Sequence, residues 1–137
     1  MRFMMIIKAP TTLEQSTPDP TEFDAMGRFN GELVRAGVLR ELNGLKPTST
    51  GAKIKCHGAE RTVIDGPFTE AKELIAGYWI IEVPSLEDAV AWAKRTPFSS
   101  EVHRGQAIEI EVRPLMEYED LPPERAAAKQ AFEQREQ

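Results

Sequence analysis

The amino-acid sequence predicts an α+β protein in which helices cover one face of an antiparallel β-sheet. Its 137 residues are enough for one folded domain with a hydrophobic core of its own. Strand-like and helix-like segments follow the order strand–helix–strand, hairpin, strand–helix–strand. The last strand-like segment, residues 107–113, alternates apolar and charged side chains, which is typical of a sheet with one face on the core.

The first strand–helix–strand unit lies within residues 3–42. Residues 3–7 are apolar at every position, so we expect both faces of this strand to be covered, one by helices and the other by a second sheet or a partner subunit. Residues 21–36 predict a helix that ends at Gly37, and residues 38–42 predict a short strand. The expected apolar stripe of this helix consists of Phe23, Met26, Asn30, Leu33 and Val34.

A β-hairpin is predicted in the middle of the chain. Residues 52–57 and 60–65 form its strands, and residues 58–59 form its turn. In this register His57 lies at the tip and Asp65 at the base, about 15 Å apart at about 3.3 Å per residue. These two side chains therefore cannot pair within one subunit.

The second strand–helix–strand unit follows the hairpin. Residues 76–83 predict a strand with Trp79 on one face. Ser85 is expected to cap the next helix, and Pro97 to stop it before the strand at residues 107–113. The expected apolar stripe of this helix consists of Leu86, Ala89, Val90 and Ala93.

These elements form a βαββαβ ferredoxin-like order with a β-hairpin inserted in the middle. Two such sheets packed face to face would cover the first strand on both sides, so the sequence predicts a homodimer through the sheet face. The domain spans residues 1–116. Residues 117–137 form a C-terminal tail, which is rich in Ala and Glu from residue 124 and is predicted to be helical.

Composition and motifs exclude several classes of function. The net charge of -5 argues against a nucleic-acid surface, and no apolar stretch is long enough to span a membrane. The single Cys56 cannot form an internal disulfide, which favours a reducing cytoplasm. We find no phosphate-binding loop, dinucleotide fingerprint, serine nucleophile motif or zinc-type spacing. We therefore expect no metal and no tightly bound cofactor.

Asp65 is the first candidate for chemistry, because it ends a strand immediately before a Gly-Pro pair. A structural role would be to cap the turn by accepting a backbone N–H two or three residues on. A catalytic role would be to exchange protons with a carbon acid or a leaving group. His103, in the loop before the last strand, is the candidate partner of Asp65. Lys72 belongs either to a solvated charged face or to the mouth of a pocket, where it would hold an anionic substrate.

Aromatic and charged side chains supply the remaining candidates. Trp79, Tyr78 and Phe68 belong either to the core or to an aromatic wall that would suit a small apolar ligand. Arg113 shares one face of the last strand with Glu109 and Glu111, which is either a solvent face or, in a dimer, part of a pocket. Arg113 is therefore a second candidate to anchor an anion.

Residues 65–73 read DGPFTEAKE. The other segments that carry a family resemblance are residues 4–8, 76–83, 91–93, 97 and 110–114. Together they resemble the YCII-related family in its DGPF-motif branch, over roughly residues 1–116. The resemblance implies a dimeric α+β barrel built from ferredoxin-like subunits. Relatives with this fold include cofactor-free enzymes such as muconolactone isomerases and dehalogenases, and other relatives act beside alternative sigma factors. Of the His–Asp pair suggested for the wider family, only the acid has a counterpart here, at Asp65.

Two hypotheses of function follow. The first is a cofactor-free enzyme that catalyses proton transfer, such as isomerisation or elimination, on a small organic substrate, with Asp65 as acid or base and Lys72 or Arg113 as anion anchor. The second is a non-catalytic dimeric module that binds a ligand or acts as an accessory or regulatory protein. The sequence does not identify a substrate or a protein partner.

Overall fold

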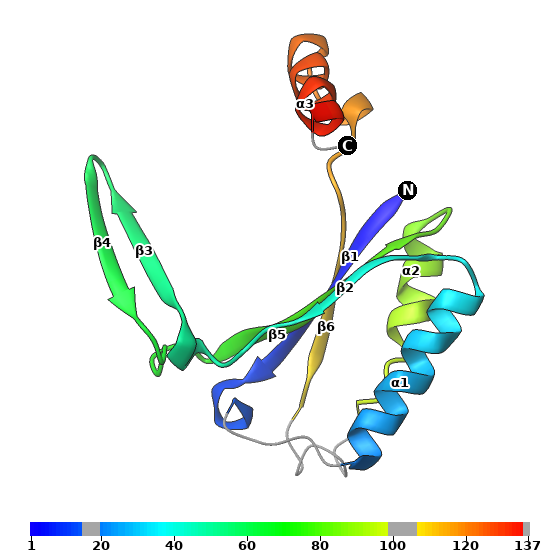
Figure 1. Ribbon diagram of the computed structural model, residues 1–137, viewed down its shortest axis with the longest axis horizontal. Helices are drawn as coiled ribbons and strands as arrows, with labels where there is room; N and C mark the ends of the chain where they lie inside the picture. Colours follow the sequence, from blue (N-terminus) through cyan, green and yellow to red (C-terminus); the bar gives the residue numbers. More distant parts are fainter. Residues whose placement is uncertain (15–19, 99–106, 136–137) are drawn as a thin grey trace.

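The computed structural model describes residues 1–14, 20–98 and 107–135 (Figure 1). Its strands and α-helices follow the order that the sequence predicts. They are β1 (Arg2–Pro10), η1 (Thr11–Leu13), α1 (Pro20–Arg35), β2 (Leu39–Gly44), η2 (Thr48–Thr50), β3 (Ala52–His57), β4 (Glu60–Asp65), β5 (Glu73–Glu82), α2 (Leu86–Ala93), β6 (Glu109–Pro114), η3 (Tyr118–Asp120) and α3 (Pro123–Arg135).

The central sheet has the strand order β2-β5-β1-β6, and every neighbouring pair is antiparallel. Strands β3 and β4 form a separate two-stranded sheet, in which Ala52 lies opposite Asp65 and His57 opposite Glu60. Gly58 adopts a positive φ of 58° in the turn between them, a conformation that favours glycine. The predicted α+β class and the predicted hairpin register are therefore confirmed.

Helices α1 and α2 cover one face of the central sheet (Figure 1). Alternate residues of β1 and β5, among them Phe3, Met5 and Trp79, point into the core between the sheet and the helices. The indole Nε1 of Trp79 donates a hydrogen bond of 2.8 Å to Oδ1 of Asn30 on α1, so its one polar atom is satisfied. The ring of Phe29 contacts that of Trp79 edge to face, with centroids 5.4 Å apart.

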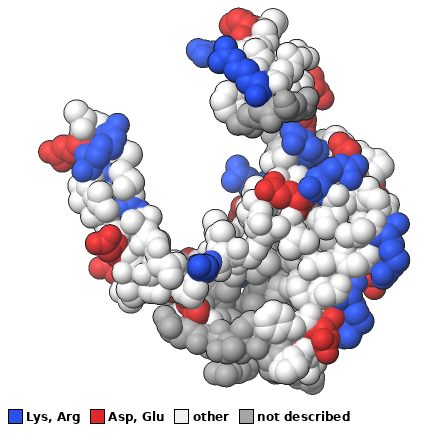
Figure 2. Space-filling view, in the orientation of Figure 1, with Lys and Arg blue, Asp and Glu red and all other residues white. Residues whose placement is uncertain are grey.

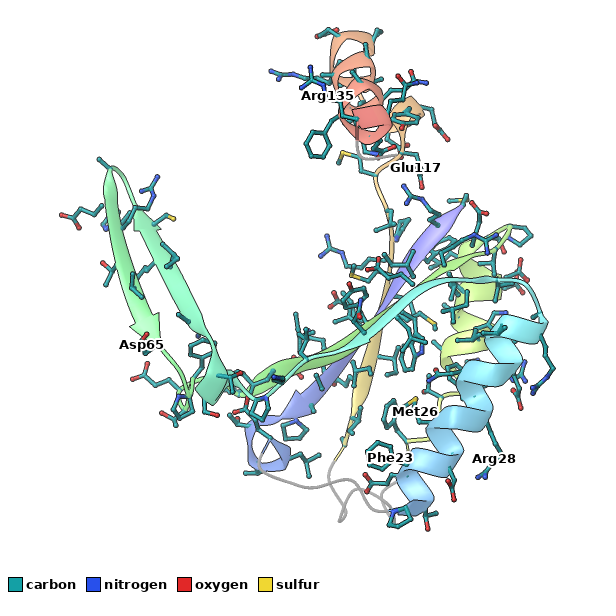
Figure 3. All side chains as sticks on the ribbon, in the orientation of Figure 1. Phe23, Met26, Arg28, Asp65, Glu117 and Arg135 are labelled. Carbon is teal, nitrogen blue, oxygen red and sulfur yellow. The ribbon has the colours of Figure 1, made fainter. Side chains whose placement is uncertain are left out.

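The apolar stripe of α1 differs from the prediction at three positions. Phe29 is the buried aromatic residue and is 3% exposed, whereas Phe23 and Val34 are 65% and 62% exposed. At about 100° per residue, Phe29 is turned about 60° from Met26 in one direction, while Phe23 and Val34 are turned about 60–80° in the other. The core therefore includes the side of α1 that contains Met26 and Phe29, whereas Val34 and Phe23, which lies near the start of the helix (Figure 3), are exposed.

Helix α2 begins as predicted and has a narrower buried stripe than predicted. Ser85 Oγ accepts a hydrogen bond of 3.2 Å from the backbone N–H of Asp88, which caps the helix. Ala89 is fully buried, but Leu86 and Val90 are exposed and line a groove of about 530 Å³ between α2 and β6.

Two parts of the chain stand away from this body, the β3–β4 hairpin and α3 (Figure 1). Both lie on the side of the central sheet opposite α1 and α2, and Figure 2 shows a wide hollow between them. All twelve strand residues of the hairpin are exposed. The C-terminal tail forms α3, which is fastened to η3 because Glu133 accepts a hydrogen bond from the Tyr118 hydroxyl and the Nζ of Lys129 lies 4.6 Å from the centre of the Tyr118 ring.

In the ranges that the structure describes, no helix is both long enough and apolar enough to cross a membrane.

Because α1 buries Phe29 and exposes Phe23, replacing each of them should have unequal effects on stability. Phe29→Ala should lower the free energy of unfolding by about 3–5 kcal/mol, because it empties a packed site beside Trp79. Phe23→Ala, the matched control, should change it by less than about 0.5 kcal/mol. Urea unfolding followed by far-UV circular dichroism measures both values. Equal destabilisation by the two substitutions would contradict this account of the core.

Candidate functional site

The candidate site is the face of the central sheet that α1 and α2 leave uncovered, called here the open face. Because side chains alternate along a strand, it carries the residues that lie between the core residues of β1 and β5. Strand pairing arranges them in rows across the sheet. One row contains Glu41, Ile80, Met4 and Arg113, and the next contains Asn43, Tyr78, Ile6 and Glu111.

Three polar side chains form a hydrogen-bonded cluster at the β2–β5 side of the open face. The hydroxyl of Tyr78 donates to Oε1 of Glu41 at 3.1 Å and accepts from Nδ2 of Asn43 at 3.0 Å. Asn43 Nδ2 also lies 3.2 Å from Glu41 Oε1. The Tyr78 hydroxyl proton is thus hydrogen-bonded to a carboxylate that can accept it, and the Asn43 amide orients both groups.

A second cluster lies near the C-terminal end of β1. The Nζ of Lys8 is 3.1 Å from Oε1 of Glu73 and 3.3 Å from Oε1 of Glu111. The hydrogen bonds to Glu73 and then to Glu111 raise the pKa of Lys8 above its usual value. Lys8 therefore stays cationic at neutral pH, with its charge already balanced by two carboxylates.

Arg113 is the open-face cation that has room for an anion. It is exposed, and among the residues that the structure describes none forms an ion pair with it. Arg2, by contrast, binds the carboxylate of Glu117 through two hydrogen bonds of 2.9 and 3.1 Å. Those bonds raise the pKa of Arg2 and fasten η3 to the first strand. A guanidinium as open as that of Arg113 suits a carboxylate ligand.

The Asp65-Gly66-Pro67-Phe68 motif lies at the base of the hairpin and has a structural explanation. A Cβ on Gly66 would lie 1.6 Å from the carbonyl oxygen of Thr48, so no other residue fits there without displacing η2. The Gly66 N–H donates to the carbonyl of Gly51 at 3.0 Å, and the Phe68 N–H donates to Oγ1 of Thr48 at 3.1 Å.

Charged side chains complete the base of the hairpin. The carboxylate of Glu14 accepts hydrogen bonds from the backbone N–H of Thr48 and, at 2.9 Å, from its Oγ1. The Nζ of Lys53 lies 4.3 Å from the centre of the Phe68 ring, within cation–π range. The base is thus a tightly bonded joint that fixes where the hairpin emerges from the body.

Asp65 itself stands apart from the bonded network of the motif. Its side chain is exposed at the end of β4, and no hydrogen bond or ion pair joins its carboxylate to any described residue. It therefore does not cap the turn, and its catalytic role stays a prediction. Lys72 is likewise exposed, in the short stretch between the motif and β5.

Those predicted site residues that the structure describes do not converge within one chain. Trp79 is part of the core on the helix side, whereas Phe68 is half-buried at the hairpin base. Arg113 lies level with Ile80 of β5, and the distance along β5 from Glu73 to Ile80 is about 23 Å at about 3.3 Å per residue. His103 lies outside the described residues.

Sequence reasoning missed the Tyr78 cluster. It placed Tyr78 on the face opposite Trp79 but did not connect it with Glu41 and Asn43, because that requires the β2–β5 register and its irregularity between Leu39 and Glu41. The alternation of Glu41 and Asn43 in a short strand was the available signal. Within the described ranges, no group of three or more His, Cys, Asp or Glu side chains is arranged to hold a metal ion.

The structure of the hairpin base predicts that two glycines joined by a hydrogen bond, Gly66 and Gly51, differ in their tolerance of an added methyl group. Gly66→Ala should disrupt the joint at a cost of about 1–3 kcal/mol, because its methyl group would overlap the Thr48 carbonyl. Gly51→Ala is the matched control, since its Cβ would be 3.8 Å from that same oxygen. Hydrogen exchange of the hairpin amides should accelerate about tenfold or more in Gly66→Ala alone. The same exchange pattern in both variants would rule out this steric role.

Comparison with known proteins identifies the family. The family model of the YCII-related domain matches residues 1–116, which include β1 to β6 and stop before η3 and α3. An uncharacterized protein of Rhizobium meliloti (strain 1021) is 36% identical over 91 residues, which cover 65% of this chain and 70% of that protein. The chain therefore belongs to the YCII-related domain family.

Proposed function

We propose that the protein is a homodimeric, cofactor-free enzyme that transfers a proton within a small organic anion, with its site on the open face. The assembly we propose is a dimeric α/β barrel of ferredoxin-like subunits, of the DGPF branch. Support comes from the strand order β2-β5-β1-β6, which is the order expected of a βαββαβ chain once the hairpin is set aside. The apolar side chains of Met4, Ile6 and Ile80 at the centre of the open face support a sheet that packs on another sheet.

The hydrogen bond between Tyr78 and Glu41 carries the proposal, because it offers a path for a proton. The Tyr78 oxygen takes a proton from a carbon acid while its own hydroxyl proton passes to the Glu41 carboxylate. Return of a proton from the Tyr78–Glu41 pair to a neighbouring carbon of the substrate completes an isomerisation. Departure of a leaving anion from the carbanion completes an elimination. Asn43 holds the Tyr78 oxygen in position throughout.

Arg113 is the proposed anchor for the anionic group of the substrate. It lies on β6, two strands from Tyr78 on β5, which is about 10 Å across the sheet. A substrate that contacts both groups would therefore span roughly that width of the open face. Asp65 and Lys72 are the competing base and anchor, because the hairpin base lies at one end of the same face.

Ligand binding tests the anchor. A thermal-shift screen of small organic acids, phenols and lactones should find an acid that stabilises the wild type by about 2.7 kcal/mol at about 100 times its dissociation constant. Arg113→Gln should abolish the shift. Arg28→Gln, an exposed arginine on α1, should keep it. Loss of the shift in Lys72→Gln with retention in Arg113→Gln would assign the anchor to Lys72.

Proton exchange tests the base. With the acid found in the screen, ¹H NMR in D₂O should show enzyme-dependent exchange of a carbon-bound proton, slowed about 100-fold or more in Tyr78→Phe. The variant should still bind the acid, since Arg113 is intact. Undiminished exchange in Tyr78→Phe, with loss in Asp65→Asn, would transfer the role to Asp65. Binding without exchange in the wild type would contradict the enzyme proposal.

Helix α3 favours a second candidate function, a non-catalytic accessory or regulatory module. It follows the residues that the family model matches, stands clear of the body and leaves Phe132 60% exposed. Under this alternative, a pull-down with the full chain should recover a stoichiometric protein partner, and removal of residues 121–137 should lose it. Retention of the partner by the shortened chain would exclude α3 as the docking element.

A further inference from the structure

We infer that the β3–β4 hairpin of one copy lies against the second copy, so that the site on the open face is completed by the partner. This inference rests on the proposed dimer and adds to it the role of the hairpin, residues 52–65, which we call the hairpin arm. It identifies the hairpin arm as an interaction surface and a second copy of this chain as its occupant.

One face of the hairpin arm is apolar and uncovered. The register of the two strands places Ala52, Ile54, Cys56 and Val63 on this face, together with Arg61 and Asp65. Ile54 and Val63 lie directly opposite each other and are 56% and 62% exposed. The other face carries mainly polar residues, namely Lys53, Lys55, His57, Glu60, Thr62 and one apolar residue, Ile64. A two-stranded sheet with one apolar face is marginally stable in water until that face is covered.

The base of the hairpin arm fixes its position relative to the body. Thr48 is contacted from both sides of the joint. Its hydroxyl and backbone N–H donate hydrogen bonds to Glu14, and Gly66 packs on its carbonyl. Thr11 Oγ1 donates to the carbonyl of Ala71 at 2.6 Å and ties the end of β1 to the chain just beyond the motif. The arm is therefore presented to a partner as a defined projection and does not fold back on its own body.

Position and charge both indicate a second copy as the occupant. The hairpin arm rises on the side of the open face (Figures 1 and 2), so any body that packs on the open face meets the arm as well. In a twofold dimer each copy supplies one arm and receives one. The arm has three basic and two acidic residues, a net charge of +1, whereas the open face and its margin have five acidic residues (Glu41, Glu73, Glu82, Glu109, Glu111) and four basic residues (Arg2, Lys8, Arg40, Arg113), a net charge of -1. The surfaces of the two copies are therefore complementary in sign.

The contact of the hairpin arm with the second copy also accounts for Asp65. Its carboxylate has no partner among the described residues of its own chain, and it shares the apolar face of the hairpin arm with Val63 and Ile54. When the arm lies on the second copy, Asp65 lies at the seam between the two subunits. The site of each subunit then includes residues from both chains.

Cys56 allows a direct test, because it is the one cysteine in the sequence and lies on the apolar face of the hairpin arm. A benzophenone maleimide attached to Cys56 is irradiated in full-length protein mixed from ¹⁵N-labelled and unlabelled chains. Mass spectrometry should find cross-links that join a labelled to an unlabelled peptide within residues 1–116. Cross-links confined to one chain, in a protein of dimeric mass, would overturn the inference and leave the dimer standing. A protein of monomeric mass would overturn both.

Two substitutions on adjacent residues provide an independent test. Val63→Asp places a charge on the apolar face and should raise the dimer dissociation constant about tenfold or more. Thr62→Asp places the same charge on the other face and should leave it within about threefold. Far-UV circular dichroism and melting temperature check that both variants fold. Equal dissociation constants for the two variants would overturn the inference, whatever the outcome of the ligand screen.

Discussion

Strand β1 sets the constraint on which the rest of the structure depends, because it is apolar on both faces and a single chain covers only one of them. Phe3 and Met5 are fully buried beneath the helices, whereas Met4 and Ile6 face the open side. The neighbouring strand β5 repeats this asymmetry, with Trp79 beneath the helices and Ile80 on the open side. The polar clusters and Arg113 surround this apolar centre, so a surface that excludes water from the centre would also enclose the groups able to do chemistry.

The conspicuous DGPF motif supports the architecture of the hairpin base. Gly66 is required by the Thr48 carbonyl, and Phe68 is held by the Thr48 hydroxyl and by Lys53. Asp65 stands apart from that network. The motif thus combines residues whose role is explained within one chain with a carboxylate that no described residue of the same chain binds. A short motif of this kind is therefore weak evidence for catalysis by itself, and the open face supplies the stronger chemical grouping.

Local signals explain which features could be predicted from the sequence. The hairpin register follows from a turn glycine between two short strands, and the start of α2 follows from Ser85 as a cap. The buried side of α1 could not be read from periodicity alone, because Phe23 and Phe29 both fit a helical stripe and only contact with the sheet distinguishes them. The Tyr78 cluster depends on pairing between strands separated by the hairpin, a long-range contact that residue spacing does not encode.

The central claim is that a second copy covers the open face, and sedimentation equilibrium tests it most directly. Wild type and Ile6→Glu are compared over a series of micromolar concentrations, since Ile6 lies at the centre of the open face between Tyr78 and Glu111. The account predicts twice the chain mass for the wild type and a shift toward the single-chain mass for the folded variant. A wild type that stays at the single-chain mass throughout the series would contradict it.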